Sequence, residues 1–211
     1  MRTWIKFCGT TSLEDAQASV EAGADALGFI FAPSKRRITP EKAGEIIKQL
    51  PQNVAKVGVF VNETAENIQA TIRQAGLTLV QLHGDESPEF VMAQRERIGV
   101  IKTILVNGNL EDRFASFCGH RECADHILLD SGSGSGLTFD WQIVRRRVDW
   151  NDVKVIVAGG LTPDNVGQAI QALMPWGVDV VSGVEAGPGK KDLAKLKAFV
   201  AAVRKSDERL A

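Results

Sequence analysis

Two residues able to move protons stand at the ends of apolar segments in this chain. Asp130 ends the run at residues 126–130, and a loop of glycine and serine follows it at residues 131–136. Cys8 follows the apolar run at residues 4–7. A carboxylic acid so placed can donate a proton, and a thiolate can remove one if its pKa falls from about 8.5 toward neutrality. Taken alone, Cys8 is equally a small buried apolar residue, which is how most free cysteines behave.

Apolar runs of this kind recur along the whole chain, each ending in a polar residue or glycine. They predict strands at residues 4–7, 26–31, 55–61, 79–82, 100–106, 127–129, 155–158 and 178–181. The runs are continuously apolar, which is typical of parallel strands covered on both faces. An open doubly wound sheet and a closed (β/α)₈ barrel both satisfy this pattern. No pair of runs has the more polar character of edge strands, and eight units close a barrel, so the barrel is favoured.

A helical pattern follows every predicted strand. The helices are expected at residues 12–23, 39–50, 64–75, 87–98, 110–117, 140–147, 163–173 and 192–204. Thr39 and Pro40 form an N-cap and first-turn pair, and Gly76 is a helix stop. Because no linker or low-complexity tract divides the chain, we expect a single-domain TIM barrel over residues 1–211, with eight parallel strands and short loops.

The composition narrows the classes of partner. The 211 residues carry 25 basic and 26 acidic side chains, a net charge of -1 that gives no global field for nucleic acid or an anionic membrane. No apolar run reaches the ~18 residues that span a bilayer, and the N-terminus has no apolar signal region. Three cysteines do not make a disulfide framework. We therefore expect a cytoplasmic protein with a small-molecule ligand.

In a barrel the carboxyl ends of the strands surround one mouth. There the sequence places a group of candidate site residues: Cys8, Arg36, Asn62, His83, Asp130, Gly159, Gly160, Ser182 and Gly183. Glycines after the seventh run and Ser-Gly after the eighth let backbone N–H groups approach a phosphate. Gly159-Gly160 alone would fit a tight turn, but both adjacent loops show the feature. Arg36 and Arg37 are either a solvated charge cluster or the clamp for a substrate carboxylate.

One further segment has the residue types of a metal site. Residues 118–126 hold two of the three cysteines and two of the three histidines, including Cys118, His120, Cys123 and His126. Their spacing fits no common zinc module. The segment also precedes a strand, which places it at the stability face of the barrel. We expect a polar loop here and no metal.

Short motifs along nearly the whole chain, in order, resemble those of the phosphoribosylanthranilate isomerase family. Residues 6–11 (KFCGTT) are similar to the family's opening K-[I/V]-C-G-[I/L]-T. The likeness continues through residues 14–16, 23–25, 28–31, 34–36, 57–62, 80–84, 128–130, 139–141, 158–166, 178–179, 182–185 and 188–192. Departures are few: Thr10 replaces an aliphatic residue, Val181 replaces a common serine, Leu137 replaces a frequent polar residue, and the loop after Asp130 is shorter than in many relatives.

The resemblance implies an isomerase of tryptophan biosynthesis. It would catalyse the Amadori rearrangement of N-(5-phosphoribosyl)anthranilate to 1-(2-carboxyphenylamino)-1-deoxyribulose 5-phosphate, the third step from chorismate. The resemblance implies Asp130 as general acid and Cys8 as general base, with no metal or organic cofactor. Substrate-binding roles are implied for Arg36 with the carboxylate, for Asp179 with a sugar hydroxyl, for His83 in the pocket wall, and for the phosphate ligands Gly159, Gly160, Ser182 and Gly183.

Other functions on the same barrel remain to be weighed. An indole-glycerol-phosphate synthase needs lysines at strand ends, whereas Lys6 falls within a run and Lys56 and Lys154 at the starts of runs. A metal-dependent epimerase needs paired histidines and carboxylates at the mouth, where His83 is alone. A non-catalytic phosphate-ligand sensor would not need candidate acid, base and clamp together. The oligomeric state, monomer or homodimer, and activity on related aminosugars stay open.

Overall fold

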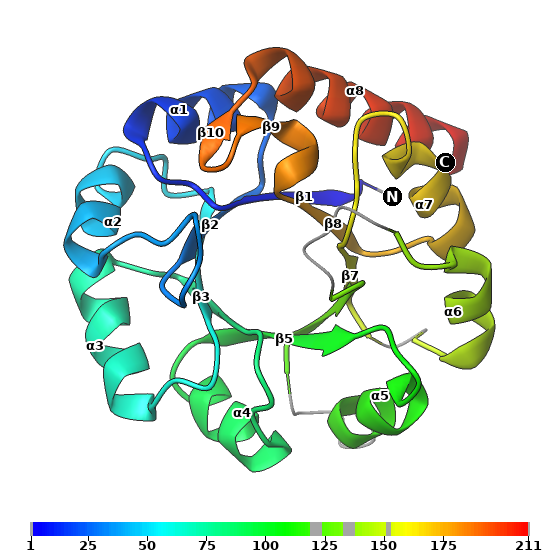
Figure 1. Ribbon diagram of the computed structural model, residues 1–211, viewed down its shortest axis with the longest axis horizontal. Helices are drawn as coiled ribbons and strands as arrows, with labels where there is room; N and C mark the ends of the chain where they lie inside the picture. Colours follow the sequence, from blue (N-terminus) through cyan, green and yellow to red (C-terminus); the bar gives the residue numbers. More distant parts are fainter. Residues whose placement is uncertain (1, 119–123, 133–137, 151–152, 211) are drawn as a thin grey trace.

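The computed structural model describes residues 2–118, 124–132, 138–150 and 153–210. Eight parallel strands close into a barrel in the order of the chain (Figure 1), which confirms the predicted (β/α)₈ fold. Every neighbouring pair is parallel, including β1 with β8. The strands are β1 (Trp4–Cys8), β2 (Ala26–Ile30), β3 (Ala55–Phe60), β4 (Leu79–Leu82), β5 (Gly99–Leu105), β6 (His126–Asp130), β7 (Val155–Val157) and β8 (Gly177–Val180).

A ring of helices surrounds the strands (Figure 1). They are α1 (Leu13–Ala22), α2 (Pro40–Ile47), α3 (Ala65–Ala75), α4 (Pro88–Arg95), α5 (Leu110–Cys118), α6 (Trp141–Arg147), α7 (Val166–Leu173) and α8 (Leu193–Leu210). Order and type follow the prediction, but some ends differ. Helix α7 begins later than expected because the preceding turn is closed by the Asn165 side chain, which accepts the N–H of Thr162 at 2.8 Å. Helices α2 and α4 end earlier than expected, and α8 continues past residue 204.

Side chains alternate between the two faces of every strand, so the barrel has two cores. The outward-facing residues, such as Phe7 and Phe29, pack under the helices. The inward-facing residues form a separate apolar cluster, made of Ala26, Val57, Ile101, Leu128, Ile156 and Ala158. Burial on both faces is the reason that the strands read as continuous apolar runs.

A small hairpin that the sequence analysis did not predict lies between β8 and α8. A 3₁₀ turn η1 (Ser182–Val184) leads into β9 (Glu185–Gly187), which pairs antiparallel with β10 (Lys190–Lys191). Figure 1 shows the hairpin over the edge of the barrel between α1 and α8. Strands of two and three residues carry too little periodicity to be recognised in the sequence.

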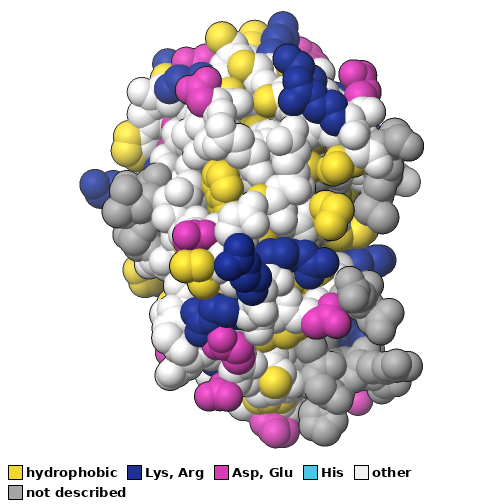
Figure 2. All heavy atoms as spheres, turned by 90° about the vertical axis from the view of Figure 1, so that its right-hand side faces the viewer, with side chains coloured by type: hydrophobic (Ala, Val, Ile, Leu, Met, Phe, Trp, Pro, Cys, Tyr) yellow, Lys and Arg dark blue, Asp and Glu magenta, His cyan; other side chains and the backbone are white. Residues whose placement is uncertain are grey.

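The surface has no dominant sign of charge on the face in Figure 2, where basic, acidic and apolar side chains lie interspersed. Among the residues that the structure describes, no helix has the length and apolarity needed to cross a membrane.

Candidate active site

A cavity of about 260 Å³ opens at the carboxyl ends of the strands. It brings together seven of the predicted site residues: Arg36, His83, Asp130, Gly159, Gly160, Asp179 and Ser182. Of the ten site residues proposed from the sequence, all of which the structure describes, Cys8, Asn62 and Gly183 do not line this cavity. Cys8 is buried, with 4% of its surface exposed, but interacts electrostatically with Asp179 of the cavity wall. The mouth of the barrel therefore concentrates most of the candidate chemistry in one place.

The thiol of Cys8 points into the barrel at the end of β1. Its neighbour in the sheet is Gly28 of β2. A Cβ atom on Gly28 would lie 2.5 Å from the Cys8 sulfur, so glycine is needed there for the thiol to occupy its place. The backbone carbonyl of Cys8 accepts a 2.6 Å hydrogen bond from the Lys191 ammonium of β10. Both ends of the cysteine are thus fixed by neighbours.

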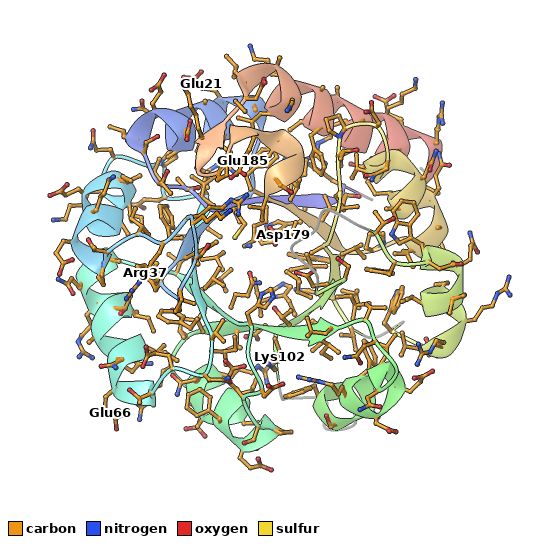
Figure 3. All side chains as sticks on the ribbon, viewed as in Figure 1. Glu21, Arg37, Glu66, Lys102, Asp179 and Glu185 are labelled. Carbon is orange, nitrogen blue, oxygen red and sulfur yellow. The ribbon has the colours of Figure 1, made fainter. Side chains whose placement is uncertain are left out.

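A buried ion pair lies next to this thiol. Lys6 precedes Cys8 by two residues and therefore faces the same way from β1. Its Nζ donates to the Asp179 carboxylate of β8 at 2.9 Å, with side chains 0% and 6% exposed. Figure 3 shows Asp179 inside the ring of strands. Asp179 also lines the cavity, so one carboxylate serves both the ion pair and the cavity wall.

The environment of Cys8 moves its pKa away from the value that a base needs at neutral pH. Burial raises the pKa of the thiol above its ordinary value, and the Asp179 charge adds to this rise. The charges of Lys6 and Lys191 oppose the rise without cancelling it. The sequence reasoning made a role as base depend on a fall in this pKa, and the raised pKa does not meet that condition, because the sequence did not show how deeply the thiol is buried.

Asp130 is held at the exit of β6 by its own loop and a histidine. Its Oδ1 accepts the N–H of Gly132 at 2.9 Å, and its Oδ2 lies 3.7 Å from Nε2 of His83. The other ring nitrogen of His83 contacts Gln81 Nε2 at 3.0 Å and Thr103 Oγ1 at 3.3 Å. Burial lowers the pKa of His83, which favours the neutral ring. An amide N–H donating to Nδ1 leaves the imidazole proton on Nε2, facing Asp130.

The glycine loops after β7 and β8 come into close contact with their neighbours. Gly159 and Gly160 have φ of 85° and 63°, values that favour glycine. A Cβ on Gly159 would lie 2.4 Å from Ser131 Oγ, and one on Gly183 would lie 1.9 Å from the Leu161 carbonyl oxygen. Side chains at these positions would push the loops apart. The glycines therefore allow backbone from three consecutive loops to line one corner of the mouth.

The two arginines of the β2–α2 loop separate in space. Arg36 lines the cavity, whereas Arg37 is exposed and lies toward the periphery in Figure 3. The Arg36 guanidinium forms a two-point ion pair with Glu185 of β9. Burial acts to raise the pKa of Glu185, but Arg36 and Lys191 outweigh it and hold this pKa below its usual range. The carboxylate opposite Arg36 is therefore ionised at neutral pH.

Comparison with known proteins decides the family. Residues 5–202 match the family described as N-(5'-phosphoribosyl)anthranilate (PRA) isomerase. The chain belongs to this family of isomerases. A relative named N-(5'-phosphoribosyl)anthranilate isomerase, from Pelobacter propionicus, is 45% identical over 202 residues, 93% of each chain. The family acts in tryptophan biosynthesis, as the sequence motifs indicated.

Solved structures of family members have the same fold. One, a phosphoribosylanthranilate isomerase in complex with reduced 1-(o-carboxyphenylamino)-1-deoxyribulose 5-phosphate, has a TM-score of 0.83 and 42% identity, covering 96% of this chain and 99% of that one. Another, described as monomers generated from a dimeric enzyme of Thermotoga maritima, has a TM-score of 0.84 and 42% identity with the same coverage.

Sequence reasoning missed three charged residues of this PRA isomerase-family site. Lys6 was noted only as a residue within a strand, and Glu185 and Lys191 only as parts of motifs. A lysine inside an apolar strand, two positions before a candidate base, is itself a signal, because period two places both on one face. No comparable local signal links Glu185 to Arg36, which is 149 positions away.

The predicted polar loop of residues 118–126 lies partly outside the described residues, which include neither His120 nor Cys123. His126 begins β6 at the other end of the barrel, where its ring stacks with Trp4 at 6.3 Å and lies 4.4 Å from the ring of Trp176. Burial lowers its pKa to about 4. In the part of the chain that the structure describes, no cluster of three acidic, histidine or cysteine side chains is placed to hold a metal. Residues 133–136 of the loop after Asp130 are also outside the described residues.

Proposed function

We propose that the chain converts N-(5-phosphoribosyl)anthranilate to 1-(2-carboxyphenylamino)-1-deoxyribulose 5-phosphate with Asp130 as general acid and Cys8 as general base. The observation that carries the proposal is the convergence at one barrel mouth of an acid, an arginine and two glycine loops, with a buried thiol next to the cavity-lining Asp179. The substrate is a phosphorylated aminosugar, a small molecule with a carboxylate at one end and a phosphate at the other. Ring opening and the proton transfers that follow it balance between the substrate and two side chains, so they call for no redox or metal cofactor.

Ring opening is the task of Asp130. Its proton goes to the ribose ring oxygen, the C1–O bond breaks, and the nitrogen lone pair forms the C=N bond of an iminium. His83 and the Gly132 N–H lie against the Asp130 oxygens and stabilise the carboxylate that remains. The cost of forming a carboxylate in this half-enclosed site is thereby reduced.

Proton abstraction is the task of Cys8. The iminium acidifies the C2–H bond, and the thiolate removes this proton to give an enolamine. The enolamine then becomes the ketone, with C1 gaining a proton and the C2 hydroxyl losing one. A thiolate with a raised pKa is a stronger base but a less populated one. The cations around Cys8, and the iminium itself, offset this by favouring the thiolate.

The two ends of the substrate would be held on different sides of the mouth. Arg36 binds the anthranilate carboxylate, since its planar fork suits a bidentate partner. Gly159, Gly160, Ser182 and Gly183 bind the phosphate through backbone N–H groups. Asp179 bonds a sugar hydroxyl through the oxygen not used by Lys6, and His83 contacts the sugar from the opposite wall. Strands β1 and β6 are separated by β7 and β8 in the ring, and this separation supports the proposal that acid and base act from different sides of the sugar.

The test is a fluorescence assay that follows loss of phosphoribosylanthranilate. Wild-type protein should turn the substrate over. Cys8→Ser, whose hydroxyl is far less acidic, and Asp130→Asn, which has no acidic proton, should each lower kcat by much more than tenfold, about 1.4 kcal/mol in barrier, with little change in KM or in thermal unfolding. Absence of turnover by the wild-type protein would refute the activity. Turnover with either variant retaining a tenth of the rate would refute that residue's role.

The proposal extends to the setting of the enzyme. We place it in the cytoplasm as one catalytic barrel domain, residues 1–211, that acts on a free metabolite, because a chain with three cysteines has no disulfide framework and suits a reducing compartment. Monomer and homodimer are both compatible with a site built from a single chain.

A further inference from the structure

The Arg36 guanidinium is engaged by a carboxylate of the same chain. Its Nε donates to Glu185 Oε1 at 2.8 Å, and its Nη2 donates to Oε2 at 2.6 Å. The Glu185 side chain is 3% exposed and that of Arg36 is 21% exposed. This contact occupies the Nε–Nη2 edge and leaves the remaining donors, including both of Nη1, for a second ligand.

Glu185 is in turn fixed from several directions. Its Oε1 accepts the Gly189 N–H at 3.2 Å and lies 3.5 Å from the Lys191 ammonium. Its backbone carbonyl accepts from Lys195 at 2.8 Å. Figure 3 shows Glu185 on the hairpin side of the mouth, beside β1. These contacts therefore hold the Glu185 carboxylate in one position.

The stem of Arg36 is also confined. A Cβ on Gly9 would lie 2.7 Å from the Arg36 Cδ, and Gly9 has a φ of 78°. Glycine there lets the arginine stem cross the chain directly after Cys8. Stem and head are both held, so the side chain has little rotamer freedom left to lose when a ligand binds.

We propose that Glu185 is a positioning residue for substrate recognition: it holds one edge of the Arg36 guanidinium and thereby aims the other donors at the substrate carboxylate. The inference rests on the proposed role of Arg36 as carboxylate clamp. Glu185 does not abolish the attraction for an anion, because Lys191 shares its charge and leaves the cluster of Arg36, Lys191 and Glu185 with a net positive charge.

The experiment is a double-mutant cycle on substrate kinetics with Glu185→Gln and Arg36→Met. Glu185→Gln keeps the shape but loses the two-point ion pair, so KM should rise between about ten- and a hundredfold. We expect kcat to fall by less than about threefold, because no group that transfers a proton is changed. In the Arg36→Met background Glu185→Gln should add little to KM, since its effect passes through Arg36. The control is Asp207→Asn, which removes a carboxylate paired with Arg204 at 2.8 Å near the start of β1 and should leave KM unchanged.

The outcomes separate the two ideas. If Arg36→Met leaves KM unchanged, the proposed clamp itself is wrong. If Arg36→Met raises KM but Glu185→Gln alone leaves it unchanged or lowers it, Glu185 only neutralises charge and the positioning role is wrong. If the two changes add independently, Glu185 acts on the fold and not through Arg36. Circular dichroism and thermal unfolding of Glu185→Gln identify a variant that does not fold, and Glu185→Asp, which keeps the charge on a shorter stem, then takes its place in the cycle.

Discussion

The buried ion pair of Lys6 and Asp179 lies next to Cys8, and its two charges should shift the pKa of Cys8 in opposite directions. Lys6→Met replaces the ammonium with an apolar group of similar length. Asp179, only 5% exposed, would be left without its cation. Breaking a buried ion pair by removing one partner costs about 3–5 kcal/mol of stability. The same change removes the charge that most opposes the burial-driven rise in the pKa of Cys8.

Lys6→Met should change the pH dependence of kcat/KM, because the Lys6 charge favours the thiolate form of Cys8. An opposite charge at close range shifts a pKa by about 1–3 units. In Lys6→Met the rising limb of kcat/KM against pH should therefore move to higher pH by at least about one unit, a tenfold loss of rate on that limb. Asp179→Asn should move the limb to lower pH, because the Asp179 charge raises the pKa of Cys8. The two variants break one ion pair and shift the limb in opposite directions.

Lys102 is the matched control for this prediction. It is a fully buried lysine on β5, paired with Glu86 at 2.7 Å, but it lies on the outer side of the barrel (Figure 3). Lys102→Met should lose stability by a similar about 3–5 kcal/mol in urea unfolding and leave the pH midpoint in place. Thiolate absorbance in the ultraviolet, taken as a difference from Cys8→Ser, should give the same midpoints without turnover. If Lys6→Met and Lys102→Met lose equal stability and neither variant shifts its pH midpoint, the electrostatic role of Lys6 is refuted.

Two further predictions concern the ends of the substrate. Arg36→Lys should raise KM by about tenfold although the charge is kept, because an ammonium cannot form the bidentate fork. Arg37→Lys, at an exposed position, should have little effect. Equal losses for the two variants in steady-state kinetics would mean that the loop acts through general charge. Inorganic phosphate should compete with substrate and raise the melting temperature, since it binds only the folded chain, and a crystal soaked in phosphate should hold the anion at Gly159-Gly160 and Ser182-Gly183. An anion bound elsewhere, with that corner empty, would contradict the phosphate assignment.

The sequence predicted the barrel because its signal is local. Eight continuous apolar runs alternate with helical patterns, and the predicted N-cap Thr39 accepts the N–H of Lys42. The side chains of Ser12, Thr64 and Ser87 cap their helices in the same way. Strand ends in a barrel converge on one mouth, so most of the site residues could be placed together without knowing any tertiary contact. The family motif at residues 34–36 includes Arg36 but not Arg37, and Arg36 is the arginine that lines the cavity.

What the sequence did not show depends on distances across the chain. The partners Lys6 and Asp179 are 173 positions apart, and Lys191 and Cys8 are 183 apart. Periodicity gives the face on which a residue lies but not the depth at which a thiol is buried. For this reason the sequence did not show that burial raises the pKa of Cys8 and keeps this residue out of the cavity lining.

The inward face of β1 carries a buried ion pair that contributes little to stability and lies next to the candidate base. Along it, Trp4 belongs to the aromatic cluster at one end, Lys6 is a buried charge in the middle, and Cys8 reaches the mouth. Replacing a buried ion pair by packed apolar residues is often neutral or stabilising, so Lys6 and Asp179 are poor choices for stability alone. Their position between an apolar floor and a candidate base instead fits a chemical need, because a thiolate in a dry site requires a nearby cation. The combined variant Lys6→Met with Asp179→Asn should therefore be more stable than Lys6→Met alone while remaining slow at neutral pH, which would separate the cost of an unpaired charge from the loss of thiolate.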